Sequence, residues 1–496
     1  MANDTPITAA MLYDLVQCPH RPTMDLFGNP AERDEINPFI QLLWEKGNAY
    51  EAEVVAGVDL PLLDLSGKLG AEREHLTKEA MEQRIPLIYA GRISTDDLLG
   101  DPDLLRLDGD KYVAGDIKSG SGEEGSDDSA SLKKHYGVQL ALYTDILERK
   151  GLSASRRPFV WDVHGDEITY DLNEPQGIRN PWTVWELYQR TLAEARGIIA
   201  QAQQTKAAYG APCKLCHWHS ACLKELDTAK DLTLLPELGR AKRDVLIEEF
   251  ETIEHLAGAD VEAFVRGKKT VFSGIGPDTL RKFRARAELV SSVSGKPYLT
   301  KPVAFPTAKV ELFFDIEVDP MRDHCYLHGF VERRNGDEAS ERYFAFLTED
   351  TSPAEEERAF CQAWHFIQER QPCAIYYYSK YERTIWRQLQ EKYPSVCSVE
   401  EIEELFEPAR SVDLYFDVVK KATEWPTRDH SIKTLAKYLG FNWRDTHPSG
   451  AASIEWFDRW ITTGDDEIKQ RILDYNEDDC IATRVLLDGI KELVVK

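Results

Sequence analysis

Apolar and polar residues alternate with a period of two in "KVELFFDIEVD" (309–319), which predicts a strand. Five apolar side chains share one face of this strand, and Asp315 and Glu317 lie side by side on the other. Helical spacing follows near the C-terminus in "YNEDDCIAT", where Tyr475 and Asp479 lie one turn apart on the same face. The C-terminal part of the chain therefore combines strands with helices and carries acidic side chains on both.

A second alternating stretch, "YVAGDIKSG" (112–120), predicts a strand that stops in a Gly/Ser turn, with Asp116 and Lys118 on one face. A Gly/Ser/acid-rich loop is expected next, at 119–131. After it, "HYGVQLALYTDIL" has the spacing of a helix that packs along one apolar face. The N-terminal part is therefore also a mixture of strands and helices.

A chain of 496 residues is too long for one ordinary core, so several domains are expected. No apolar run is long enough to span a bilayer, and the N-terminus lacks a basic segment before an apolar stretch, so we expect a cytoplasmic protein without a membrane partner. The net charge of −26 argues against a protein that coats nucleic acid non-specifically. An enzyme acting on nucleic acid stays open, because carboxylates that hold Mg²⁺ are acidic and a local basic strip can carry the phosphates.

Acidic side chains precede the strand at 112–120 in an order that suits metal-dependent hydrolysis. Asp103 follows Pro102, and Asp116-x-Lys118 comes about a dozen residues later. Two carboxylates can hold a divalent cation that polarises a phosphodiester and generates hydroxide, while a lysine orients or deprotonates the attacking water. This arrangement resembles that of the PD-(D/E)xK nucleases; a strand that merely leads into a turn is the alternative.

Two flanking features make the chain similar to the RecB-like branch of that superfamily, in which G-x3-(H/E), Asp, D-x-K and Q-x3-Y occur in this order. "EKGNAYEAEVV" supplies Gly47 and Glu51 on a predicted helix, and Gln139 and Tyr143 share one face of the helix after the loop. The resemblance implies Mg²⁺ or Mn²⁺ ligands at Glu51, Asp103 and Asp116, and catalytic roles for Lys118, Gln139 and Tyr143. Many relatives have His where this chain has Glu51, so the metal preference is expected to differ.

Three cysteines stand close together in "PCKLCHWHSAC", as Cys213-x2-Cys216-x5-Cys222. Nine cysteines in 496 residues do not make a secreted disulfide framework, so this cluster indicates metal or redox chemistry. Zinc bound with the help of His217 or His219 is one possibility. Cysteines without any ligand are another.

A lone cysteine, Cys18 in "LYDLVQCPHRP", precedes the predicted nuclease core. This spacing resembles that of RecB-like nucleases with an iron–sulfur staple, which have one Cys before the core and C-x2-C-x5-C after it. The resemblance implies a [4Fe–4S] cluster held by Cys18, Cys213, Cys216 and Cys222. Four thiolates suit such a cluster, and a link between both ends of the domain couples cluster loss to unfolding.

The middle of the chain contains "VFSGIGPDTLRKFRARA" (271–287), with two glycines before an apolar helical pattern. It resembles the hairpin of a helix-hairpin-helix motif, in which glycines let backbone N–H groups approach a DNA phosphate at a helix N-terminus. "LLPELGRAKRDVL" is a weaker copy with Glu237 at the first glycine position, and Asp278 is the single acid among the basic residues of the second copy. The expected DNA-binding residues are Gly274, Gly276, Lys268, Lys269, Arg281, Lys282 and Arg284. An ordinary helical linker with a solvated basic face is the alternative.

The order D-x-E, a middle acid and then Y-x3-D resembles the DEDD (tyrosine type) 3′–5′ exonucleases of RNase H-like fold. The resemblance implies that Asp315 bridges two Mg²⁺ ions and that Glu317 and Asp479 complete the first metal position. Tyr475 would position the attacking water.

The middle acid departs from that family, because its usual N-x3-D form is missing. Glu382 in "YSKYER" stands at the Asp position, and Asp413 is a less favoured substitute. The extra methylene of Glu382 is expected to weaken the second metal position. A folded but inactive RNase H-like module is therefore the alternative.

Together these resemblances imply an α/β multidomain chain. A restriction-endonuclease-like nuclease core is expected at 1–230, a helix-hairpin-helix-like connector at 231–300 and an RNase H-like mixed sheet at 305–496. The expected function is metal-dependent hydrolysis of nucleic acid, above all single-stranded DNA, at two active sites. The competing hypothesis is a nucleic-acid-binding adaptor in which one or both sites are inactive and a separate helicase is the active partner.

Overall fold

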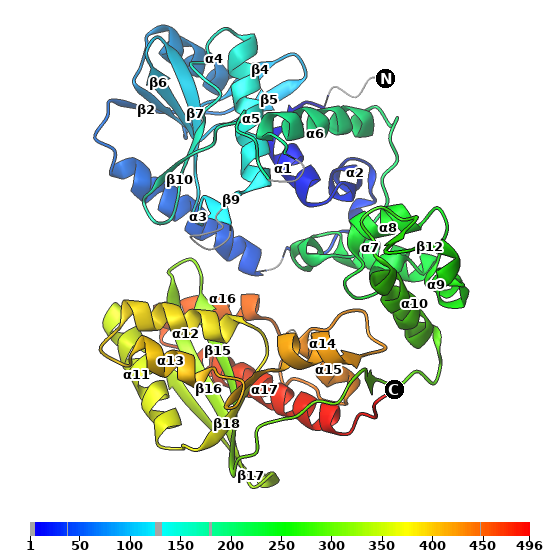
Figure 1. Ribbon diagram of the computed structural model, residues 1–496. Coiled ribbons are helices and arrows are strands. Elements are labelled where there is room, and N and C mark those ends of the chain that lie inside the picture. The colour runs from blue at the N-terminus through cyan, green and yellow to red at the C-terminus, as the bar shows by residue number, and fades with distance from the viewer. Residues whose placement is uncertain (1–4, 37, 125–130, 178–180, 447) are drawn as a thin grey trace. The chain divides into compact units, whose positions relative to one another are not determined.

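The computed structural model describes residues 5–36, 38–124, 131–177, 181–446 and 448–496. The chain divides into two compact units, Met1–Leu223 and Lys224–Lys496 (Figure 1). Part of the predicted loop at 119–131, namely 125–130, lies outside the described residues. Among the described helices, none combines the length and the apolar character that crossing a membrane requires.

The first unit is built on a six-stranded mixed sheet in the order β11–β10–β7–β6–β3–β2. The strands are β2 (Leu62–Asp64), β3 (Leu87–Tyr89), β6 (Leu104–Asp108), β7 (Lys111–Ile117), β10 (Phe159–Trp161) and β11 (Glu167–Thr169). Strand β7 pairs antiparallel with β6 and parallel with β10. Smaller sheets are formed by β1 (Ile7–Thr8), β4 (Ile93–Thr95) and β5 (Leu98–Gly100), and by β8 (Glu123–Glu124) and β9 (Ser131–Leu132).

Helix α5 lies in the core of this unit. Its buried face is the apolar face that the sequence predicts. Val138, Leu142 and Ile146 are fully buried, and α1 and α6 pack against the same helix. The helices are α1 (Ala9–Gln17), α2 (His20–Phe27), α3 (Pro38–Ala56), α4 (Gly70–Glu82), α5 (Lys134–Arg149) and α6 (Val184–Ile199), and the boundary between the units falls within α7 (His219–Ala229). Strand β7 turns Tyr112 and Ala114 toward this core, and Asp116 continues the same face.

The second unit begins with short helical elements, α8 (Gly239–Leu246), α9 (Ile253–Gly258) and α10 (Pro277–Ser291). Helices α9 and α10 pack together, and the hairpin of β12 (Val265–Arg266) and β13 (Lys269–Thr270) lies between them in sequence. Leu280 and Phe283 of α10 are buried, as the helical pattern predicts. This region belongs to the same compact unit as the C-terminal sheet.

The C-terminal sheet has five strands in the order β17–β16–β15–β18–β19. They are β15 (Val310–Asp319), β16 (His324–Arg334), β17 (Asp337–Leu347), β18 (Cys373–Tyr377) and β19 (Ser411–Asp413). The remaining elements are α11 (Pro353–Gln368), α12 (Tyr381–Lys392), α13 (Val399–Leu405), α14 (Lys420–Ala422), α15 (Ile432–Tyr438), α16 (Gly450–Thr463), α17 (Asp466–Lys491), β14 (Tyr298–Leu299) and β20 (Thr423–Glu424). Figure 1 shows α11, α12 and α13 on one side of this sheet and α17 on the other.

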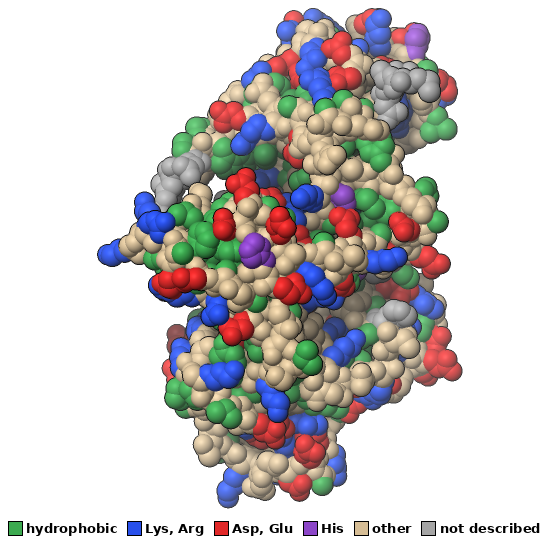
Figure 2. Space-filling view, turned by 90° about the vertical axis from the view of Figure 1, so that its right-hand side faces the viewer, with side chains coloured by type: hydrophobic (Ala, Val, Ile, Leu, Met, Phe, Trp, Pro, Cys, Tyr) green, Lys and Arg blue, Asp and Glu red, His purple; other side chains and the backbone are tan. Residues whose placement is uncertain are grey.

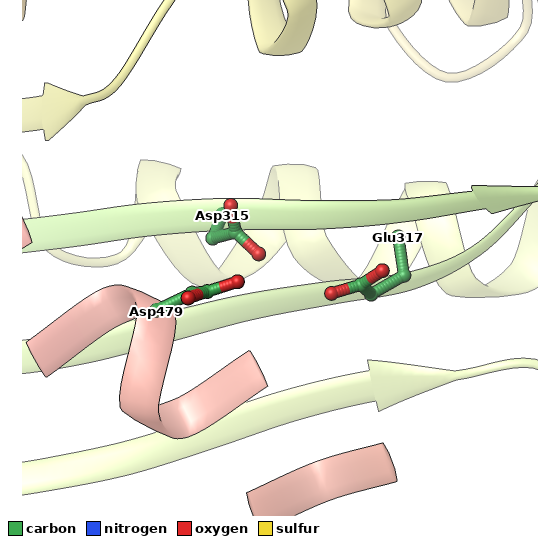
Figure 3. A group of neighbouring side chains, drawn as sticks. All are labelled: Asp315, Glu317 and Asp479. Carbon is green, nitrogen blue, oxygen red and sulfur yellow. The ribbon is translucent and has the colours of Figure 1, made fainter. Parts of the chain in front are cut away.

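Strand β15 is apolar on one face and acidic on the other, in the register that its alternation predicts. Leu312, Phe314 and Ile316 pack in a cluster with residues of α11 and α12. Asp315 and Glu317 point the opposite way, toward α17 (Figure 3). Both carboxylates therefore lie on a central strand, because β15 pairs with β16 on one side and with β18 on the other.

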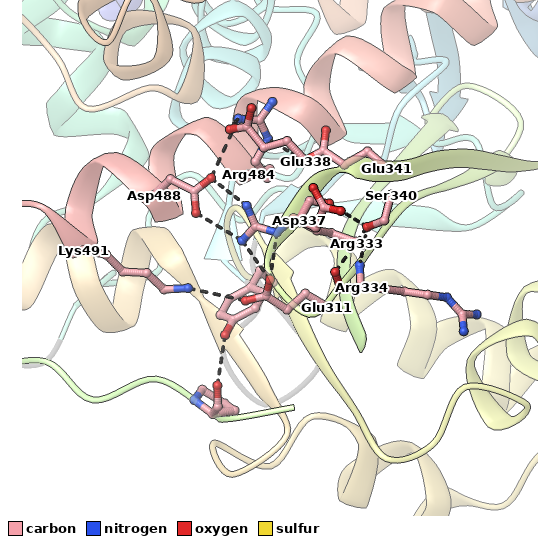
Figure 4. Close-up of polar contacts among 12 residues, drawn as sticks. Glu311, Arg333, Arg334, Asp337, Glu338, Ser340, Glu341, Arg484, Asp488 and Lys491 are labelled. Atoms are coloured by element: carbon pink, nitrogen blue, oxygen red, sulfur yellow. Dashed lines mark hydrogen bonds and ion pairs between the residues drawn. The ribbon is translucent and has the colours of Figure 1, made fainter. Parts of the chain in front are cut away.

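A charge network at the other end of the same strand fixes α17 on the sheet (Figure 4). Arg333 of β16 is only 3% exposed and lies 2.8 Å from Glu311 of β15 and 2.7 Å from Asp488 of α17. Removing one partner of such a buried pair typically costs about 3–5 kcal/mol. Because α17 also carries Tyr475 and Asp479, this network sets the position of both residues along the sheet.

Candidate active sites

The first candidate site lies where β7 ends, and its central residue is Asp116. The Asp116 side chain is fully buried, and the Lys118 ammonium lies 3.1 Å from its Oδ2 atom. Within the described part of the chain, no group donates a hydrogen bond to the Oδ1 atom of Asp116. Asp103, which directly precedes β6, accepts a hydrogen bond of 2.9 Å from the Ile117 N–H. The two carboxylates are therefore fixed beside neighbouring strands.

The electrostatics of this site follow from the crowding of acids. Tyr89 at the end of β3 forms a hydrogen bond with the carboxylate of Glu51 on α3. Burial, and then the Asp116 carboxylate, raise the pKa of Asp103 well above its usual range. Burial lowers the pKa of Lys118, but the carboxylates of Asp116 and Asp103 outweigh it, so the net shift of that pKa is upward. Lys118 is therefore held as a cation among acids.

The donor set suits a hard divalent cation. Carboxylate oxygens are the ligands that Mg²⁺ and Mn²⁺ prefer, and a buried carboxylate oxygen without a donor is a position that a cation satisfies. The three predicted ligands are loosely gathered, because no group of three ligand atoms within 4.8 Å of one another, among the residues the structure describes, contains Glu51, Asp103 or Asp116.

Gln139 and Tyr143 lie one turn apart on α5, as their spacing predicts. The Gln139 amide donates to the Tyr143 hydroxyl at 3.2 Å, and that hydroxyl donates to the Asp101 carbonyl at 3.3 Å. Burial raises the pKa of Tyr143, and the Asp116 and Asp103 carboxylates raise it further. The pair therefore lies within electrostatic reach of the predicted metal ligands.

His135 of α5 lies near the same site; beside Lys133 and Lys134, the sequence predicts a plain surface histidine rather than a phosphate contact. Its ring packs between Tyr13 and Tyr136 with centroids 4.7 and 4.6 Å away, and the Lys118 ammonium is 5.4 Å from the Tyr136 ring. Burial, and the Lys133 and Lys118 cations, lower the pKa of His135 to about 4. His135 is therefore neutral at pH 7, and no spacing rule on α5 alone could have placed it beside Tyr13 of α1.

The four predicted cluster ligands line one pocket of the first unit. They come from the C-terminal end of α1, from the segment that leads into α7 and from α7 itself, and they are Cys18, Cys213, Cys216 and Cys222. His219 lines the same pocket. His217 is directed elsewhere, because its Nε2 atom lies 2.7 Å from the Asp25 carboxylate.

The cysteines act on one another electrostatically. Burial raises the pKa of Cys216, the Arg21 guanidinium lowers it, and the Cys18 and Cys213 sulfurs raise it. Residues almost two hundred positions apart are thus brought to one pocket that also contains a cation. Such a pocket can hold an anionic thiolate cluster.

The second candidate site is formed by carboxylates of β15 and α17. One ligand atom each from Asp315, Glu317 and Asp479 lies within 4.8 Å of the other two, and Figure 3 shows the three side chains converging. Burial, and then Asp479, raise the pKa of Glu317 to about 8. The same two causes raise the pKa of Asp315 well above its usual range. Three crowded acids in this arrangement suit a divalent cation.

Side chains from other elements hold these carboxylates in place. The Trp443 indole N–H donates to Asp479 Oδ1 at 2.7 Å, and the Asn476 amide donates to Asp315 Oδ2 at 2.7 Å. Asn476 accepts in turn from the Tyr343 hydroxyl at 2.8 Å. Sequence reasoning missed these three residues, although Asn476 directly follows Tyr475 in the motif.

The Asn476 side chain reaches Asp315 because the residue that pairs with Asp315 on the neighbouring strand is a glycine. Gly329 of β16 pairs with Asp315 of β15 in register. A Cβ atom at Gly329 would lie 1.6 Å from the Asn476 Oδ1 atom, so any larger residue there displaces the amide. The backbone of β16 is thus part of the site.

Tyr475 and Glu382 complete the predicted set. Tyr475 is 3% exposed, and the Lys433 ammonium of α15 donates to its hydroxyl at 2.7 Å. Glu382, at the start of α12, is 4% exposed; burial raises its pKa to about 8, and its charge acts on Asp315. Asp413 instead accepts from the Phe416 N–H at 2.9 Å as the cap of the following turn. Glu382 is therefore the better placed middle acid, yet it stands outside the tight group of three.

The region predicted to bind DNA contains the β12–β13 hairpin, a turn and helix α10, and it has more acids than its sequence suggests. Gly274 has a φ of 75° and Gly276 caps α10; Glu237 adopts a φ of 64°, as a glycine at that position would. Lys268 and Lys269 are exposed. The other three predicted basic residues form ion pairs, which are Arg281 with Glu262 and Asp278, Lys282 with Glu237, and Arg284 with Glu288.

Acids remote in sequence therefore reduce the local basic charge. The face in Figure 2 likewise carries acidic and basic side chains interspersed. Arg286 is 1% exposed and bonded to Glu424 at 2.6 Å, so it belongs to the interior of the second unit.

Comparison with protein families finds a match in two parts of the chain. A family model of the PD-(D/E)XK nuclease superfamily matches residues 29–223, and one of the RNase H superfamily matches residues 312–490. No curated protein matches the chain. The expected fold class, an α/β multidomain chain with a PD-(D/E)XK nuclease domain and an RNase H-like domain, is confirmed. Both superfamilies support a metal-dependent nuclease that acts on nucleic acid.

Proposed function

We propose that this chain is a two-site nuclease that hydrolyses single-stranded DNA with Mg²⁺ or Mn²⁺. Its first site is of the RecB-like type and its second is a 3′–5′ exonuclease of the DEDD type. The observation that carries the proposal is that each unit places buried carboxylates beside a lysine, around Asp116 and Lys118 in one and Asp479 and Lys433 in the other.

At the first site, Glu51, Asp103 and Asp116 are the metal ligands. A divalent cation held by these residues would polarise the phosphodiester and lower the pKa of a water molecule. Lys118, whose ammonium lies 3.1 Å from Asp116 Oδ2, would orient that water. Gln139 and Tyr143 support the carboxylates from α5.

At the second site, Asp315, Glu317 and Asp479 would hold one cation, and Glu382 with Asp315 would offer a second, weaker position. Tyr475 positions the attacking water. The side chains that orient this set are buried and hydrogen-bonded, which is the preorganisation that catalysis requires. The separation of Glu382 from the group of three predicts that one cation binds more tightly than the other.

The cysteine pocket is proposed to hold a [4Fe–4S] cluster through Cys18, Cys213, Cys216 and Cys222. Around a single zinc ion, thiolates at about 2.3 Å from the metal would lie roughly 3.8 Å from one another. No three of these sulfurs lie within 4.8 Å of one another in the described structure, which favours a larger group. The His217 side chain contacts the Asp25 carboxylate, so its Nε2 atom is not directed at the cysteines as a zinc ligand would be.

The connector is proposed to contact the DNA backbone. Its exposed hairpin residues Lys268 and Lys269, and the backbone at Gly274 and Gly276, offer donors to phosphates. The paired residues Arg281, Lys282 and Arg284 exchange a carboxylate for a phosphate on binding. Charge-assisted contacts of this kind make binding depend strongly on salt.

The proposal is tested with labelled single-stranded DNA, labelled single-stranded RNA and Mn²⁺, using protein that retains its cysteine-bound group. The wild type should cleave DNA, and the double variant Asp116→Ala/Asp315→Ala should leave it intact. A matched control is Asp110→Ala/Asp323→Ala, because Asp110 is exposed and the Asp323 side chain is 80% exposed. Intact DNA after incubation with the wild type would instead support an adaptor that works with a helicase.

A further inference from the structure

Lys433 is a charged side chain at the second site that belongs to none of the motifs above. It comes from α15, which packs against α17. Its ammonium lies 2.7 Å from the Tyr475 hydroxyl, 3.8 Å from Asp479 Oδ2 and 4.8 Å from the centre of the Tyr475 ring. The side chain is 29% exposed.

The local structure of α15 does not explain a lysine at this position. Ser431 caps the helix by accepting from the Thr434 N–H, which makes Lys433 the second residue of the first turn. The partial positive charge of a helix N-terminus favours an acid there and disfavours a cation. Lys433 therefore costs α15 a small amount of stability, and its contacts lie with α17 instead.

The chemistry of the contact assigns a direction to the hydrogen bond. An ammonium has three donors and no acceptor, so Tyr475 must accept from Lys433. The Tyr475 O–H and the second lone pair of its oxygen are then available for contacts on the side of the metal ligands, where Asp479 lies. Asp479 is itself fixed from the other side, because Trp443 donates to its Oδ1 atom.

We propose that Lys433 is a positioning residue of the second site, which holds the Tyr475 hydroxyl in the orientation that binds the attacking water. The inference rests on the proposed exonuclease function. Contact with Tyr475 is shorter than contact with Asp479, so the tyrosine is the group through which Lys433 acts. The lysine makes no bond to the substrate in this account.

The first test compares kcat and KM on 3′-labelled single-stranded DNA with Mn²⁺, in an Asp116→Ala background that silences the first site. Lys433→Met should lower kcat by about 10- to 100-fold, the range of one hydrogen bond to a charged group. KM should stay within about twofold, because positioning acts on the transition state. Lys437→Met is the matched control on the exposed side of the same helix and should leave both constants unchanged.

A double-mutant cycle separates positioning from other roles. In a Tyr475→Phe background, Lys433→Met should cause no further loss, because the hydroxyl that it orients is gone. Lys433→Arg keeps the charge and a donor, and should recover part of the lost kcat. A raised KM with unchanged kcat, or additive losses in the cycle, would overturn the assignment and identify a phosphate contact instead.

Calorimetric titration with Mn²⁺ checks that the site itself survives. Lys433→Met removes a cation 3.8 Å from Asp479, so it should bind Mn²⁺ at least as tightly as the parent. Weaker Mn²⁺ binding would mean that the variant has damaged the site, and the assignment would fall. A parent without any exonuclease activity overturns the proposed function, whereas an active parent with a fully active Lys433→Met variant overturns this inference alone.

Discussion

Arg286 holds helix α10 to strand β20 within the second unit, and its replacement by Met should destabilise that contact strongly. Its guanidinium bonds to Glu424 at 2.6 Å, to the Pro236 carbonyl at 2.7 Å and to Glu237 at 3.0 Å. Met removes all three bonds and leaves Glu424 buried, a loss of about 3–5 kcal/mol for a broken buried pair. Lys282 stays 4.0 Å from Glu424 and offsets part of the loss, so we expect about 3 kcal/mol.

Amide hydrogen exchange of the full chain measures this loss locally. Protection of α10 and β20 should fall about 100-fold, because each 1.4 kcal/mol is a factor of ten. Helix α5 of the other unit serves as internal reference and should not change. Arg281→Met on the same helix is the matched control: its side chain is 46% exposed, so losing its ion pairs should change protection little.

The effect of pH provides a second check of the same contact. Burial tends to raise the pKa of Glu237, but Arg286 and Lys282 lower it to about 2. A lowered pKa gives stability that is present above pH 4.5 and is lost as the pH falls toward about 2. This acid-dependent loss should be smaller in Arg286→Met. Equal exchange in the Arg286 and Arg281 variants at pH 7 would refute the reasoning.

Three further predictions concern the proposed sites. Cys18→Ser should lose the brown absorbance of the cluster as completely as Cys216→Ser does, and a full cluster in Cys18→Ser protein would point to zinc or to another ligand. Asn476→Ala should lower second-site kcat by about 10-fold, the value of one hydrogen bond of about 1.4 kcal/mol; unchanged kcat would exclude a role in orienting Asp315. Burial raises the pKa of Glu317 to about 8 from 4.5, so metal-free protein should melt at a lower temperature at pH 8 than at pH 5, and Mn²⁺ should remove the difference. A higher melting temperature at pH 8 without metal would contradict these shifts.

The parts of each site that sequence predicts are those that one element fixes alone. Asp315 and Glu317 share a face because a strand has a period of two, and Gln139 and Tyr143 meet because a helix brings positions four apart together. Asp116 and Lys118 follow the same rule at 3.1 Å. These relations need no knowledge of the tertiary fold.

The parts that sequence does not predict come from contacts between elements. Lys433 reaches Tyr475 from 42 residues away and Trp443 reaches Asp479 from 36 residues away, and no spacing rule spans such distances. The connector shows the converse, because its sequence has a single acid among basic residues while Glu237, Glu262 and Glu424 fold onto them. The charge of a sequence segment therefore predicts the local charge of the folded surface less well than spacing within one element predicts which side chains lie together.

The central claim is that two separate sites cleave nucleic acid, and the most direct test is the pair Asp116→Ala and Asp315→Ala made separately. Each variant is incubated with Mn²⁺ and single-stranded DNA labelled at either the 5′ or the 3′ end. The account predicts that each variant loses a distinct set of products and keeps the other. Loss of all cleavage through Asp116→Ala alone would contradict it.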